Sequence, residues 1–128
     1  MNMSFLSCAP SLFLWRSDRA FIAKWCRHFT DGSPMQGNHL WHYFSWNGIR
    51  QHPRALESFQ HNASKGYSVY TMSHNCHQKE RYVKHTVHMS PHDVIQYRKD
   101  IYVVATDWSW TYVQTHEDGL GPYFVKLN

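Results

Sequence analysis

The adjacent pair His116-Glu117 is where the residue types of this sequence first suggest chemistry. The pair lies within the stretch TDWSWTYVQTHEDGLGPYF at positions 106–124, between an aromatic run and a glycine-rich turn. An imidazole beside a carboxylate can transfer a proton or bind a ligand. The next residues are Asp-Gly-Leu, so the pair does not begin an HExxH motif, which places two zinc-binding histidines on one face of a helix.

Strand geometry would separate the members of this pair. If a strand over residues 110–115 continues, His116 lies on the face of Trp110 and Glu117 on the opposite face, because neighbouring strand residues alternate. A histidine-carboxylate dyad would then need a partner from elsewhere, and His42 in a mid-chain aromatic segment is the candidate. Three roles stay open for the pair: hydrogen bonds that fix the following turn, contact with a ligand or partner, and catalysis.

A second group of candidate residues could bind a metal. His74, Cys76 and His77 lie within four consecutive positions, and His85 and His88 follow them. Imidazole and thiolate are the usual ligands of zinc. The spacing matches no established zinc motif, and His85 and His88 would face opposite sides of a strand. We therefore expect no cofactor and solvated surface histidines, with a zinc site as the less favoured alternative.

The aromatic residues are the third feature. Six tryptophans and eight tyrosines are more than a small core requires, and both types also anchor protein interfaces. Trp108 falls in the predicted tip of a hairpin, where it either contacts a partner or folds back and caps the core. The candidate binding residues are Trp41, His42, Trp108, Trp110, His116 and Glu117.

Apolar spacing indicates the elements that position these residues in the first half of the chain. An amphipathic helix is predicted after an N-cap at Ser17. Its apolar positions are Phe21, Ile22, Trp25, Cys26 and Phe29. The segment LWHYFSW at 40–46 has large residues at both parities, which indicates a strand buried on both faces. A second helix is predicted to begin at Pro53 and to end at Gly66.

The second half alternates strands with one short helix. The predicted strands are residues 67–72, 82–89, 101–106, 110–115 and 123–127. Ser90 caps a helix expected to reach about Arg98. The third and fourth strands, separated by Asp-Trp-Ser, form an antiparallel hairpin. We predict one α+β domain over residues 1–128, with residues 1–14 as a flexible N-terminal segment and a mainly antiparallel sheet packed against about three helices.

Charge, cysteine content and the first residues indicate which partners and which cell compartment to expect. The formal charge is +4, but acids are interspersed among the bases, so nucleic acid is not the favoured partner. Three cysteines without regular spacing indicate a reducing compartment. The first residues lack the charged start and apolar length of a signal peptide. We therefore expect a cytoplasmic protein that does not associate with a membrane.

Four segments resemble those of an uncharacterised bacterial family, known only as a domain of unknown function. They are LWHYFSW at 40–46, DIYVV at 100–104, WTYVQTHE at 110–117 and GPYF at 121–124. The likeness extends from Trp15 to Phe124. The sequence departs from it at Ala105, where the resemblance leads us to expect an acid, and at Leu120, where it leads us to expect cysteine. The resemblance implies a shared fold and brings no activity with it.

A short hairpin that ends in Thr-His-Glu is also similar to hairpins of small immunity proteins from bacterial toxin systems. We therefore expect a binding protein of the immunity type with a protein partner, whose contact surface surrounds Trp108, Trp110 and His116. The alternative is a metal- or histidine-dependent enzyme, similar to a hydrolase, that uses His42, His116 and Glu117. Catalysis is the less favoured of the two, and a nucleic-acid binder comes third.

Overall fold

A five-stranded antiparallel sheet forms the centre of the protein. The computed structural model describes residues 19–30, 40–41, 43–44, 54–74, 80–117 and 120–127. The elements in chain order are a helix over residues 19–29, α3 (Ala55–Asn62), the 3-10 helix η1 (Ala63–Lys65), β1 (Tyr67–His74), β2 (Glu80–Lys84), α4 (Pro91–Gln96), β3 (Ile101–Ala105), β4 (Trp110–Gln114) and β5 (Tyr123–Lys126).

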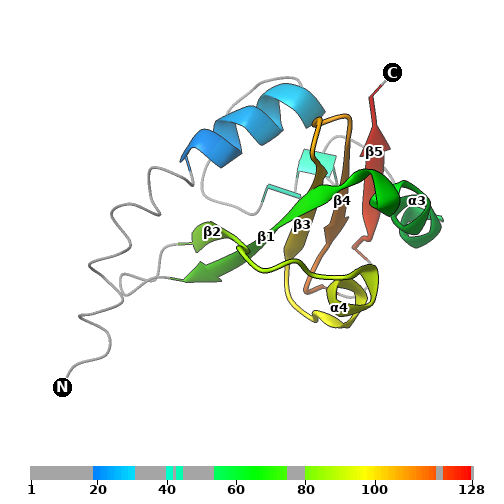
Figure 1. Cartoon of the computed structure of the whole chain (residues 1–128). Coiled ribbons are helices and arrows are strands. Elements are labelled where there is room, and N and C mark those ends of the chain that lie inside the picture. Colours follow the sequence, from blue (N-terminus) through cyan, green and yellow to red (C-terminus); the bar gives the residue numbers. More distant parts are fainter. Residues whose placement is uncertain are drawn as a thin grey trace.

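The strand order is β2-β1-β3-β4-β5, and helices cover both faces of the sheet (Figure 1). The central strand β3 is buried over its whole length. Tyr102 and Val104 pack with the helix over residues 19–29, whereas Val103 faces α3 and α4. The predicted α+β class, with its antiparallel sheet, C-terminal hairpin and about three helices, is confirmed.

The first helix uses the predicted apolar positions. Phe21, Trp25, Cys26 and Phe29 are buried, and Ile22 packs partly buried against them. The Trp25 indole N–H donates to the hydroxyl of Thr111 at 3.1 Å, and this hydroxyl in turn donates to the Val103 carbonyl at 2.8 Å. A buried polar chain thus fixes the helix on the sheet, since each buried polar group has a partner. The predicted cap, Ser17, lies outside the described residues.

The predicted strand at 40–46 is wrong for the residues described there. Leu40 and Trp41 form a turn, and Tyr43 and Phe44 are helical. The Tyr43 N–H donates to the Leu40 carbonyl at 3.1 Å, and the Phe44 N–H donates to the Trp41 carbonyl at 3.0 Å. These local bonds replace a strand ladder. Aromatic residues at both parities indicate burial, and a tight turn against the sheet satisfies that pattern as well as a strand does.

Two tyrosine hydroxyls hold this turn. The Leu40 N–H donates to the hydroxyl of Tyr82 at 3.1 Å, and the Trp41 N–H donates to that of Tyr102 at 2.9 Å. Burial, and then the neighbouring Tyr82, raise the pKa of Tyr102 well above its ordinary value, so its hydroxyl stays neutral. The backbone of the turn therefore finds its acceptors on sheet side chains.

Two further boundaries differ from the sequence prediction. β2 ends at Lys84 instead of continuing to residue 89, and Val87 beyond it is 77% exposed. α4 begins with the predicted capping box at Ser90 but ends at Gln96, short of Arg98. The other predicted helix and strands are confirmed with small shifts at their ends. Within the described ranges, the helices lack either the length or the apolar character needed to cross a bilayer.

The side chain of Gln114 on β4 binds the C-terminal end of α4. Its amide nitrogen donates to the carbonyls of Val94 and Tyr97, at 3.0 and 3.1 Å. Its amide oxygen accepts the hydroxyl of Tyr112 at 2.7 Å. The last carbonyls of a helix lack partners within it, and here a strand side chain supplies one.

The β3–β4 hairpin tip folds back onto the first helix. Trp108 has a φ of 59°, which a bulky residue rarely adopts, and its N–H donates to the Ala105 carbonyl at 2.9 Å. Its ring lies 6.2 Å from that of Phe29, with the Lys24 ammonium 4.7 Å from the ring centre. Of the two predicted orientations, the structure shows the one that caps the core.

We predict that Trp108→Ala lowers the free energy of unfolding by about 2 kcal/mol, because it removes the ring contacts with the helix. Trp108→Gly should cost about 1 kcal/mol less than the alanine variant, since glycine accepts the positive φ. Urea unfolding measures both. Val87→Ala at an exposed position is the control, with an expected change within about 0.5 kcal/mol. An alanine variant as stable as this control would contradict the packing of Trp108.

Candidate functional site

A buried carboxylate, that of Asp100, lies immediately before β3. Its side chain is 1% exposed. Oδ2 accepts the indole N–H of Trp41 at 2.9 Å, and Oδ1 accepts both the backbone N–H and the ring Nδ1 of His116, each at 2.7 Å. A charged carboxylate tolerates burial when N–H donors surround it. We call Trp41, Asp100 and His116 the Asp100 cluster.

Strand register brings Asp100 and His116 together. Ile101 on β3 pairs with Gln114 on β4, so the residues just beyond these strand ends meet. Because β4 ends at Gln114, His116 is not held to strand alternation, and its ring packs edge-on against Trp41 with 6.1 Å between centroids. The strand therefore does not continue through His116, and alternation does not place this residue on the face of Trp110.

The imidazole of His116 connects the buried acid to the surface. Its side chain is 43% exposed, and its Nε2 lies 3.7 Å from Oε1 of Glu117, which is 47% exposed. The placement on opposite faces was expected only if the strand continued, and β4 ends before these two residues. With Nδ1–H donated to Asp100, the outward Nε2 of a neutral ring is an acceptor. It can take a proton or accept a hydrogen bond from a ligand.

A surface groove of about 800 Å³ runs beside His116. Its lining residues are Ile95, Gln96, Tyr97, Arg98, Thr115 and His116. Most of these side chains are polar, and Arg98 is exposed. Gln114 positions one wall by binding the end of α4, and Asp100 positions His116. The groove therefore combines hydrogen-bond donors on two fixed elements.

The predicted tryptophans do not form one surface with His116. Trp41 and Trp110 are 0% and 1% exposed. Trp108 packs with the first helix, whereas Trp110 belongs to the cluster on the opposite face of the sheet. The two-residue spacing suggests a shared face, but the turn at Trp108 breaks the alternation. His42 lies outside the described residues.

The predicted metal ligands lie largely outside the described part of the chain. Cys76, His77 and the side chain of His74 are among these. Nε2 of His85 is 2.9 Å from the Thr71 hydroxyl. Among the residues that the structure describes, no group of three or more His, Cys, Asp or Glu side chains could hold a metal ion. The zinc site at His74, Cys76 and His77 stays a prediction.

The sequence analysis did not single out Asp100 as a site residue. The signal was available: an acid directly precedes the five consecutive buried residues of β3. An acid at the edge of such an apolar strand is a candidate for a buried, hydrogen-bonded carboxylate. Its partners come from positions 41 and 116, and that pairing becomes visible only in the fold.

A family model described as "Domain of unknown function (DUF4275)" matches residues 19–124. The chain belongs to this family. The resemblance to a domain of unknown function is thereby confirmed, and the DUF4275 match includes the Asp100 cluster, strands β1 to β4 and the first two residues of β5. No curated protein and no solved structure matches the chain.

We predict that Asp100→Asn lowers the free energy of unfolding by about 2–4 kcal/mol. Asparagine has the same shape but only one acceptor oxygen, so at least one N–H of the Asp100 cluster loses its partner. Urea unfolding followed by tryptophan fluorescence measures the change. Glu117→Gln makes the same chemical change at a half-exposed position and should shift stability by less than about 0.5 kcal/mol. Equal stabilities for the two variants would refute the buried hydrogen bonds.

Proposed function

We propose that this chain is a small cytosolic bacterial binding protein, of the immunity type, that covers a site on a protein partner with the groove beside His116. The main support for this proposal is that the buried Asp100 fixes the half-exposed ring of His116 through a 2.7 Å hydrogen bond to Nδ1. A side chain already held in one orientation loses little entropy on binding. This supports a preformed contact surface.

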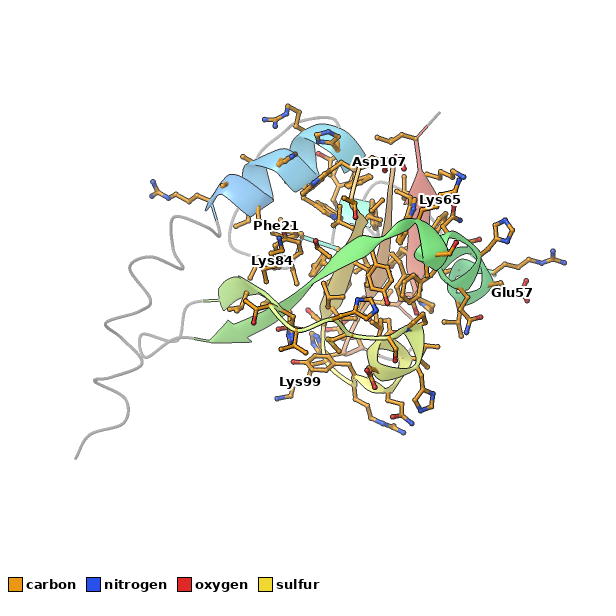
Figure 2. The ribbon with its side chains drawn as sticks, in the orientation of Figure 1. Phe21, Glu57, Lys65, Lys84, Lys99 and Asp107 are labelled. Carbon is orange, nitrogen blue, oxygen red and sulfur yellow. The ribbon has the colours of Figure 1, made fainter. Side chains whose placement is uncertain are left out.

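The charges near the groove favour an acidic segment of the partner. Arg98 lines the groove and Lys99 follows it, both exposed, and Figure 2 shows Lys99 on the side of the molecule where α4 lies. Glu117 is the acid beside His116. The formal charge of the whole chain, +4, would also steer an acidic protein toward it.

The tryptophans have a supporting role in this proposal. Trp41 lies beneath His116 and shares its carboxylate, so it holds the contact surface in place from within the core. Trp110 and Trp108 stabilise the hairpin whose far end carries His116. Arg98, Tyr97 and His116 then become the residues that touch the partner, in agreement with the frequency of arginine and tyrosine in interfaces.

We predict that Arg98→Ala and His116→Ala each weaken partner binding at least about tenfold, because each removes a donor from the groove. The partner is first captured from the source cell with the full chain as bait, and its Kd is then measured by calorimetry with purified protein. Lys84→Ala removes an exposed lysine of β2, outside the groove, and should change Kd less than about twofold.

Thermal unfolding of each variant serves as the check that the fold is kept. If Arg98→Ala and His116→Ala bind the captured partner as tightly as the unmodified chain, the groove is not the contact surface. If Lys84→Ala weakens binding as much as they do, only general charge attraction is being measured.

A second candidate function is histidine-dependent hydrolysis. The observation that favours it is the carboxylate-imidazole pair itself, since a buried acid that holds Nδ1–H leaves Nε2 ready to act as a general base. Glu117 could accept a proton beside it, and the third proposed residue, His42, lies outside the described part of the chain.

Turnover separates the two candidates. Hydrolysis predicts measurable cleavage in a panel of ester, amide and phosphodiester substrates, and a loss of about 100-fold or more in His116→Gln, which keeps a polar side chain but not the base. Turnover that is unchanged in this variant would exclude His116 as the base.

A further inference from the structure

A second cavity lies at the other end of the β3–β4 hairpin. It has a volume of about 330 Å³ and is bounded by η1, the hairpin tip and β5. This volume falls in the range of small-molecule sites. Asp100 precedes β3 whereas Thr106, which lines the cavity, follows it, so the five residues of β3 separate the cavity from the groove at His116. The two sites are distinct.

The cavity walls are held by bonds between separate elements. The Thr106 N–H donates to the Gly66 carbonyl at 3.1 Å, and the Leu127 N–H donates to the Ser109 carbonyl at 2.7 Å. Gly66 has a φ of 95°, and a Cβ added there would lie 2.9 Å from the Thr106 hydroxyl. The close approach of η1 to the hairpin thus depends on glycine.

Two lysines line this cavity, Lys65 from η1 and Lys126 from β5. The Lys126 ammonium donates to Oδ1 of Asn62 at 3.2 Å; Asn62 is only 6% exposed, and its Nδ2 donates to the Ser58 carbonyl at 2.8 Å. A buried amide therefore positions one cation. An ammonium has three donors, and a neutral amide leaves its charge uncompensated.

One acid, Asp107, also lines the cavity, where the hairpin tip hydrogen-bonds it and the charge of Lys65 also favours its ionised form. Its Oδ1 accepts the hydroxyl of Ser109 at 2.6 Å and the Ser109 N–H at 3.1 Å. These two hydrogen bonds lower the pKa of Asp107. Two lysines against one carboxylate leave the cavity with an excess of positive charge.

We propose that this cavity binds a small anion, a carboxylate- or phosphate-bearing molecule, through Lys65 and Lys126. At the hairpin tip the Thr106 hydroxyl can add a donor, whereas both donors of Ser109 are bonded to Asp107, and the Trp110 ring, stacked on Phe124 at 5.7 Å, also lines the cavity. Figure 2 shows Lys65 and Asp107 at the hairpin-tip end of the sheet, and Lys84 and Lys99 away from it.

The test is an NMR titration of the isotope-labelled full chain with inorganic phosphate and, separately, with succinate, each at constant ionic strength. We expect saturable shifts of the Gly66, Thr106 and Ser109 amides with a Kd of about 1 mM, since an ion of few atoms binds weakly. Saturation by phosphate alone identifies a phosphate ligand, saturation by succinate alone identifies a carboxylate, and either supports the site.

Matched variants localise the binding. Lys65→Ala and Lys126→Ala should each raise the Kd at least about fivefold, Lys65→Arg should keep it within about twofold, and Lys84→Ala should leave it unchanged. Amide spectra confirm that each variant is folded. The proposal is overturned if neither probe gives saturable shifts at these amides, or if Lys84→Ala weakens binding as much as Lys65→Ala.

Discussion

The carboxylate of Asp100 joins three parts of the chain that are distant in sequence. It lies at the start of the most buried strand and receives N–H groups from Trp41 and His116. An unpaired buried charge would cost several kcal/mol, so the folded state requires both partners in place. The turn that contains Trp41, the central strand and the segment after β4 are therefore expected to form together.

The same requirement shapes the surface. A histidine at the end of a strand would ordinarily sample several rotamers, but the bonds from its backbone N–H and Nδ1 to Asp100 hold the ring of His116 in one orientation. Gln114, two residues earlier, fixes the end of α4 on the opposite wall of the groove. The hydrogen bonds that stabilise the buried Asp100 and the end of α4 thus also hold the polar side chains of the groove in place. Such an ordered site suits either ligand binding or proton transfer.

The sequence predicted the fold well where local signals decide it. Local signals include the β-branched and aromatic content of β3 and β4, the capping box at Ser90 and the apolar stripe of the first helix. For the described part of the segment at 40–46, the sequence indicated burial correctly but not the turn, because the backbone of Leu40 and Trp41 is held by the hydroxyls of Tyr82 and Tyr102, which lie far away in the chain.

The candidate site was predicted only in part for the same reason. His116 and Glu117 stood out by type, but their proximity depends on the end of β4, and the anchor Asp100 is recognised only through its distant donors. Trp108 and Trp110 were grouped by spacing, and the positive φ of Trp108 separates them. The cavity at Lys65 and Lys126 gave no sequence signal, because these lysines come from η1 and β5 and meet only in three dimensions.

The tautomer of His116 tests the central claim most directly. A two-bond nitrogen-proton NMR spectrum of the full chain, recorded where the ring is neutral, reports which nitrogen carries the proton. Donation to the buried Asp100 predicts the Nδ1–H form, with this proton protected from solvent exchange. An Nε2–H ring with unprotected exchange would show that Asp100 does not hold His116 and would contradict the account.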